Sequence, residues 1–203
     1  SFVGNNPHSI KWFEYNAAGS NDFTVDVIYE PAISSSTEEI LHFAVGDLDG
    51  DSYYDLAVAR KTDSISKVSI LLGQSAAFSP TFKWNVDFTN DFGINDPRWI
   101  ELADLDNSGS LDIIVAGQDN ITILYNGGMG TNEKLSVSKQ TLATFDGVAY
   151  QVRAFDLNLD QRLDLIFTSF STDHDPVRVF IQDSTGKFIE TANAFPDLDP
   201  TSN

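Results

Sequence analysis

Apolar and polar residues alternate along this chain in short runs that recur as a set of four. Period-two alternation rich in β-branched and aromatic residues is typical of β-strands. The predicted first and second strands are Phe43–Gly46, Ile100–Ala103 and Val152–Phe155, then Leu56–Ala59, Ile113–Ala116 and Leu165–Thr168. The predicted third and fourth strands are Val68–Leu72, Ile121–Tyr125 and Val177–Ile181, then Phe82–Asp87, Leu135–Lys139 and Lys187–Thr191. No segment predicts a helix, so we expect an all-β protein.

An acidic loop of nine residues joins the first strand to the second in each set. The three loops are 47–55 (DLDGDSYYD), 104–112 (DLDNSGSLD) and 156–164 (DLNLDQRLD), called loops one, two and three. Positions 1, 3, 5 and 9 carry side-chain oxygens each time, and position 7 offers its main-chain carbonyl. An oxygen-only set of this kind favours Ca²⁺ over Mg²⁺, with up to three ions. The predicted ligands are Asp47, Asp49, Asp51, Tyr53, Asp55, Asp104, Asp106, Ser108, Ser110, Asp112, Asp156, Asn158, Asp160, Arg162 and Asp164.

The spacing of the loops indicates the architecture. Their first Asp residues are 104 − 47 = 57 and 156 − 104 = 52 residues apart. Units of this length with four antiparallel strands are typical of β-propeller blades. We expect one repeat domain, 1–203, with approximate units 1–40 (a partial blade), 41–96, 97–147 and 148–203.

The partial unit at the start of the chain has a third strand, Ile10–Tyr15, and a fourth, Phe23–Ile28. Ser1–Gly4 matches a second strand, so one first strand is missing from about four repeats. The chain is then either a fragment of a larger propeller or a ring completed by another chain. An unpaired strand edge would invite self-assembly.

Two other interpretations of the loops compete with the predicted nine-residue calcium loop. A helical EF-hand loop needs Glu at position 12, where this chain has Val58, Val115 and Phe167. The Asp and Asn residues could also serve only as turn formers, but four carboxylates in loop one repel one another without a cation. Charge predicts affinity falling from loop one to loop three, which has Asn158, Arg162 and no glycine.

Composition limits the setting and the partners. The net charge of −18 argues against nucleic acid. The absence of cysteine excludes disulfides, thiolate zinc sites and cysteine nucleophiles. No stretch approaches 18 apolar residues, so we expect no membrane insertion. Extracellular Ca²⁺ is concentrated enough to fill weak sites, which favours a secreted or cell-surface protein.

The residues around loop one resemble a known family. Phe43–Ala59, FAVGDLDGDSYYDLAVA, resembles the FG-GAP/VCBS repeats of bacterial surface proteins and integrin α-chain propellers. Residues Ile10–Thr24 are similar to the third strand, turn and fourth strand of these repeats. The literal Phe-Gly and Gly-Ala-Pro signatures are absent, so the VCBS-like branch fits better. The resemblance implies extracellular adhesion, glycan binding or a structural role.

Three functions follow as expectations. The first is a non-catalytic module that binds a glycan or a protein, with Ca²⁺ in a structural role. The second is a structural subunit of an extracellular filament or surface assembly. The third, a propeller-fold polysaccharide-degrading enzyme, has no supporting residue, because His8, His42 and His174 share no spacing with a nucleophile. We therefore expect no catalysis.

Four further residues bear on these functions. Trp99 is the best aromatic candidate for stacking on a sugar, whereas Trp12 occupies a core slot. Glu101 and Arg153 hold the same slot in adjacent units. They either pair with each other across the two units or are solvated separately.

Overall fold

The fold is all-β, as the alternation predicts. The computed structural model describes residues 10–15, 23–29, 39–61, 66–74, 82–88, 94–130, 132–171 and 176–191. These residues form strands and turns, and every strand pair is antiparallel. The described ranges include no helix that could cross a membrane. The segment Ser1–Gly4, predicted as a strand, lies outside the described residues, as do residues 192–203.

The described strands agree closely with the predicted ones. They are β1 (Ile10–Tyr15), β2 (Phe23–Tyr29), β3 (Glu39–Gly46), β4 (Asp55–Lys61), β5 (Ser66–Gly73), β6 (Phe82–Phe88), β7 (Trp99–Ala103), β8 (Asp112–Ala116), β9 (Gln118–Met129), β10 (Leu135–Phe155), β11 (Asp164–Ser171), β12 (Val177–Gln182) and β13 (Phe188–Glu190). They pair in three sheets of order β1-β2, β3-β4-β5-β6 and β13-β12-β11-β10-β9-β8-β7.

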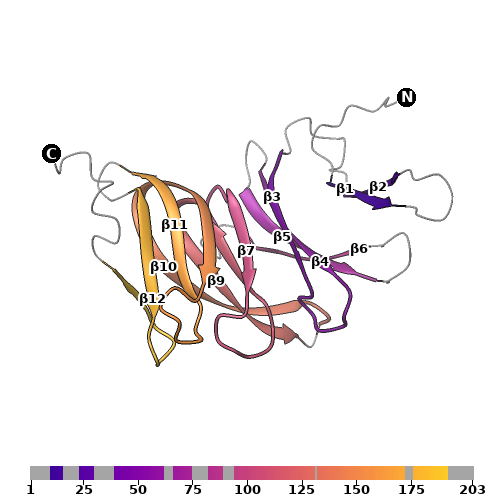
Figure 1. The fold of residues 1–203 in the computed structure, drawn as a ribbon. Helices are drawn as coiled ribbons and strands as arrows, with labels where there is room; N and C mark the ends of the chain where they lie inside the picture. The colour runs from indigo at the N-terminus through magenta and orange to yellow at the C-terminus, as the bar shows by residue number, and fades with distance from the viewer. Residues whose placement is uncertain are drawn as a thin grey trace.

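The strand order divides the chain into repeated four-stranded units. Unit one is β3–β6. Unit two is β7, β8, β9 and the first half of β10, and unit three is the second half of β10 with β11–β13. The units follow one another in chain order from β3 to β12 (Figure 1). The first strands meet where the units meet, because β3 lies against β7 and β7 against β10.

One long strand replaces two predicted ones. We expected separate strands at Leu135–Lys139 and Val152–Phe155, but β10 runs through both. Its first half pairs with β9, from Leu135 to Thr144, and its second half pairs with β11, from Gly147 to Phe155. The register shifts between Thr144 and Val148 mark the change of partner. No tight turn is needed here, so units two and three share one sheet.

Two buried apolar clusters fill the space between consecutive units. Members of the cluster between units one and two include Leu48, Val68, Ile70, Ile100, Ile113 and Val115. Members of the cluster between units two and three include Leu105, Ile114, Ile121, Ile123, Val152 and Phe167. Burying an aliphatic or aromatic side chain contributes roughly 1.5–3 kcal/mol. Because each cluster draws on two units, a unit is stabilised mainly by its neighbours.

Candidate metal centres

All three acidic loops leave the units at the same end, which is the lower edge in Figure 1. They follow β3, β7 and the end of β10. Their backbones take the same course, because positions 4 and 6 have positive φ in each. The angles are Gly50 82° and Ser52 72°, Asn107 56° and Gly109 89°, and Leu159 63° and Gln161 70°. Loop three adopts this form without the glycine that usually favours it.

The first Asp of each loop holds the turn together. Asp47 accepts the N–H groups of Gly50 at 2.7 Å and Ser52 at 2.9 Å. In loops two and three the first Asp accepts the N–H groups of positions 5 and 6. For Asp104 these two distances are 3.0 and 2.9 Å, and for Asp156 they are 3.0 and 2.8 Å. The residues at positions 3 and 5 accept N–H groups two residues on, as turn formers do. Turn formation therefore accompanies the clustering of the ligands.

The Asp at position 9 ties each loop to the third strand of its own unit. Asp55, Asp112 and Asp164 are fully buried. Asp55 accepts the N–H of Leu48 at 2.6 Å and that of Gly73 at 2.8 Å. The corresponding distances are 2.8 and 2.9 Å in loop two and 2.9 and 2.8 Å in loop three. Each buried carboxylate thus satisfies two main-chain donors.

Loops one and two gather carboxylates tightly enough for one cation. Asp47, Asp49 and Asp51 offer oxygens that all lie within 4.8 Å of one another, and so do Asp104, Asp106 and Asp112. Oxygens on opposite sides of one Ca²⁺ are about 4.8 Å apart, since each Ca–O distance is about 2.4 Å. The donor chemistry and the spacing therefore fit Ca²⁺ in both loops.

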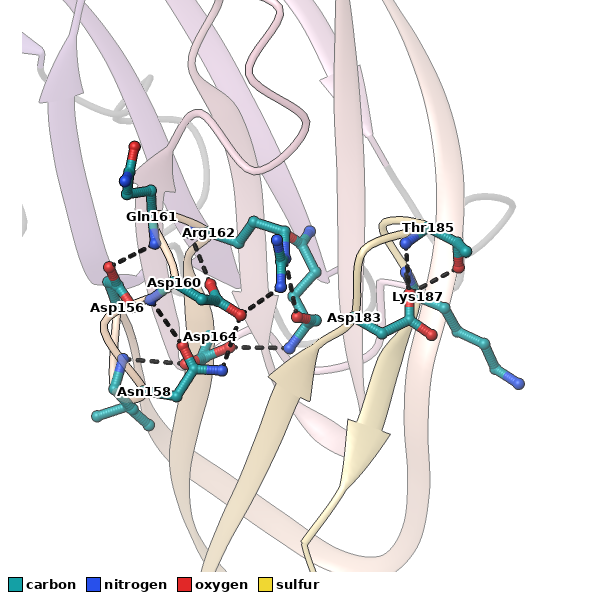
Figure 2. Close-up of polar contacts among 11 residues, drawn as sticks. Asp156, Asn158, Asp160, Gln161, Arg162, Asp164, Asp183, Thr185 and Lys187 are labelled. Atoms are coloured by element: carbon teal, nitrogen blue, oxygen red, sulfur yellow. Dashed lines mark hydrogen bonds and ion pairs between the residues drawn. The ribbon is translucent and has the colours of Figure 1, made fainter.

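Loop three carries its own positive charge. The guanidinium of Arg162 pairs with Asp160, and its Nε donates to the carbonyl of Gln182 at 3.2 Å. Asn158 donates to the same Asp160 carboxylate at 2.9 Å. Figure 2 shows Asp156, Asn158 and Asp160 facing one another, with Arg162 beside Asp160. The predicted Ca²⁺ site in this loop stays a prediction, and Arg162 supplies part of the neutralisation there.

Three carboxylates of loops one and two, those of Asp49, Asp55 and Asp112, have a raised pKa. Burial raises the pKa of Asp55 to about 6, against the N–H bonds from Gly73 and Leu48 that lower it. Burial likewise raises the pKa of Asp112 and of Asp49, and neighbouring Asp residues add to both shifts. Burial together with unneutralised like charge is the environment that a bound cation relieves.

A comparison of the sequence with known protein families gave a match over the part of the chain that runs from loop two to loop three. Residues 104–167 match the model of the FG-GAP-like repeat family. The match begins at position 1 of loop two and ends at position 12 of loop three, and it spans 167 − 104 + 1 = 64 of the 203 residues. Comparison with curated proteins and with solved structures gave no match.

The matched span includes two of the acidic loops. It contains β8, β9, the whole of β10 and the beginning of β11, with a loop at each end. The matched span therefore covers the whole of the long strand β10. This match confirms the family resemblance over residues 104–167.

The first strands carry contacts that bear on two other predictions. Arg153 Nη1 lies 3.0 Å from Glu101 Oε2, so the predicted pairing of these two residues is confirmed. Trp99 is stacked on His42 with ring centroids 3.8 Å apart, and the Arg153 guanidinium lies 5.1 Å from its ring centroid. His42 therefore occupies one face of the Trp99 ring, and the stacking of Trp99 on a sugar stays a prediction.

His42 lies in β3 and is half-buried. His42 Nδ1 accepts the N–H of Ile100 at 3.2 Å, which links unit one to unit two. Burial, with the nearby Arg153 charge, lowers the pKa of His42. His8, His174 and the side chains of Trp12 and Trp84 lie outside the described residues.

Two residues that contact the loops were missed by the sequence analysis. Asn126 and Gln182 are buried at the end of the third strand in units two and three. The available signal was an amide side chain at the same slot in two units, directly after Tyr125 and Ile181.

Proposed function

We propose that this protein is a secreted or cell-surface β-propeller module that binds Ca²⁺ in its acidic loops and uses it structurally. The observation that carries the proposal is the pair of carboxylate clusters in loops one and two, at the same end of consecutive units. Within each cluster the carboxylate oxygens lie within 4.8 Å of one another. Asp47, Asp49, Asp51, Asp55 and the carbonyl of Tyr53 would hold the ion in loop one. The ion would supply the positive charge that these carboxylates lack.

Calcium in this role would act through the folded state. A ligand that binds only the folded chain stabilises it by mass action. Each loop joins the first two strands of a unit, and its position-9 Asp contacts the third. An ion held there would therefore fix three strands of one unit at a single point.

Calcium titration calorimetry tests this proposal. We expect binding heat from the wild-type protein and the tightest site in loop one, where four Asp side chains are available. Asp47→Asn should remove that site, and Asp183→Asn, in the turn between β12 and β13 and outside the nine residues of any loop, is the control. Equal affinity at every site would contradict the ranking by charge, and the absence of heat would contradict calcium binding.

The module itself would be non-catalytic and bind a glycan or a protein. The match to the FG-GAP-like repeat family supports this proposal, as does a sequence that has no Gly-x-Ser-x-Gly motif. Calcium-loaded protein should bind a defined subset of an immobilised glycan or protein array, and excess chelator should weaken that binding. Release of sugar products from a bound polysaccharide would overturn the non-catalytic assignment.

Assembly of copies is a second candidate. Phe43 and Val45 of unit one are 45% and 48% exposed, and Phe155 and Leu157 of unit three are 54% and 44% exposed. A contact between these two different surfaces on successive copies would be head-to-tail and form a filament. Sedimentation should then show polymers that grow with concentration and disappear in Val45→Lys. A single mass at all concentrations would contradict assembly.

A further inference from the structure

Two buried side-chain amides connect the acidic loop of one unit to that of the next. Asn126 lies in β9 of unit two, and Gln182 is the last residue of β12 in unit three. They are 5% and 2% exposed. A buried amide is costly unless its hydrogen bonds are made, so its partners show what it holds in place.

Asn126 contacts both loop one and loop two. Its Nδ2 donates to the carbonyl of Leu48, position 2 of loop one, at 2.7 Å. The same nitrogen donates to the carbonyl of Leu111, position 8 of loop two, at 3.1 Å. Its main-chain N–H donates to Asp112, position 9 of loop two, at 2.9 Å. The Oδ1 accepts the N–H of Gly128 at 2.8 Å, so the amide is held at both ends.

Gln182 repeats this arrangement one unit further on. Its Nε2 donates to the carbonyl of Leu105, position 2 of loop two, at 2.9 Å. Its main-chain N–H donates to Asp164, position 9 of loop three, at 2.8 Å. Unit one has Gly73 at this slot, which has no side chain to donate and contacts its loop only through its main-chain N–H, bonded to Asp55. The amide therefore occurs in units two and three, each of which has a complete described unit before it in the chain.

These bonds act on the predicted ligands of two loops at once. Position 2 lies between the ligand positions 1 and 3, so fixing its peptide group restricts where both carboxylates point. Position 9 is itself a predicted ligand. A shift of one loop on binding an ion would thus be passed through the amide to the ligands of the next loop.

We propose that Asn126 and Gln182 are positioning residues that couple neighbouring calcium sites, so that filling one loop raises the calcium affinity of the next. This inference rests on the proposed binding of Ca²⁺. Coupling of this kind is reciprocal, so loops one and two favour each other equally through Asn126. We expect a coupling factor of about fivefold or more.

Calorimetry on variants with silenced loops measures the coupling factor. Asp156→Asn silences loop three and leaves a protein with loops one and two. Adding Asp47→Asn or Asp104→Asn leaves a single loop. The product of the two stepwise association constants of the two-loop protein, divided by the product of the two single-loop constants, gives the factor. A value of about five or more supports the coupling, and a value of one with calcium still bound overturns it.

Substitution of the amide then assigns the coupling to Asn126. In Asn126→Leu the factor should fall to one while each loop still binds Ca²⁺. Gln118→Met, an exposed amide in the same strand, is the control and should keep the factor. A factor that persists in Asn126→Leu overturns the role of this residue.

Gln182→Met provides a second, milder test, because methionine keeps the length of glutamine and removes only the polar amide. With loop one silenced, it should bring the factor between loops two and three to one. This test decides the proposal if Asn126→Leu does not fold. An absence of binding heat even in the wild-type protein would overturn the proposed calcium binding itself, which is a different result from a factor of one.

Discussion

Loops one and three have the same backbone course and are neutralised in different ways. In loop one, Asp47, Asp49 and Asp51 face one another, and none of the nine residues is basic. In loop three, Asn158 replaces one carboxylate and Arg162 pairs with Asp160. The turn itself is therefore built by main-chain bonds to carboxylates, and the side-chain charges decide whether a cation or an arginine balances it.

The two ends of the unit series differ in packing as well. The position-2 leucines Leu48 and Leu105 are 2% and 1% exposed, because the following unit covers them. Leu157 holds the same position in loop three and is 44% exposed. The same loop position thus serves as a contact between units in one place and as surface in another.

The largest expected effect separates these leucines. Leu105→Ala should lower the free energy of unfolding by about 3 kcal/mol, since it opens a cavity between units two and three. Leu157→Ala should cost less than about 1 kcal/mol because its side chain is already half in water. Urea unfolding of both variants at equal calcium concentration measures the difference. Equal costs would show that the neighbouring unit does not stabilise the loop.

The pH dependence of loop one follows from the raised pKa of Asp55. Its folded-state pKa of about 6 lies above the ordinary value of 3.8. The associated stability is therefore present below pH 4 and is lost as the pH rises through about 6. Calcium-free protein should lose up to about 2 kcal/mol from this group between pH 4 and pH 7.5.

Chemical unfolding in chelator across this pH range measures the Asp55 effect. Asp55→Asn does not titrate, so the loss of stability between pH 4 and pH 7.5 should be smaller in that variant than in the wild-type protein. Bound Ca²⁺ favours the ionised carboxylates, so the stabilisation by calcium should increase from pH 5 to pH 7.5. A profile unchanged by Asp55→Asn would contradict the assignment.

Arg162→Gln sharpens the contrast between loops one and three. Without calcium it should lower stability slightly, because a partly exposed ion pair with Asp160 is lost. With calcium it should increase the affinity of loop three, because the positive charge that opposes the ion is gone. Calorimetry of Arg162→Gln and Asp47→Asn,Arg162→Gln separates loop three from loop one. A weaker loop-three site in both would contradict the role given to Arg162.

The smallest expected effect concerns the backbone of loop three. Leu159 has φ 63° and is 86% exposed, so Leu159→Gly should relieve strain and stabilise the protein by about 0.5 kcal/mol. Gly50→Ala is the matched control in loop one, where φ is 82° and a Cβ would meet no atom within 4 Å. It should cost about 1 kcal/mol. Thermal unfolding of both variants shows whether the signs are opposite.

The sequence allowed the strands and the loops to be predicted because both are local patterns. Strand β1 has the predicted bounds, and the loops fall between the strands as expected. The continuity of β10 was missed, because the absence of a turn between two strands leaves little signal. The contacts of Trp99 and Asn126 were missed because their partners are 57 and 78 residues away, in His42 and Leu48. Contacts between units depend on how the units pack, which no single repeat encodes.

Thermal unfolding in calcium and in excess chelator tests the central claim most directly, that the carboxylate clusters of loops one and two hold structural Ca²⁺. At calcium concentrations about 100 times the dissociation constant, one site contributes about 2.7 kcal/mol, which corresponds to a rise in Tm of roughly 5–10 °C. We predict a rise of this size in the wild-type protein and its loss in Asp49→Asn,Asp106→Asn. Identical melting curves of the wild-type protein in calcium and in chelator would contradict the account.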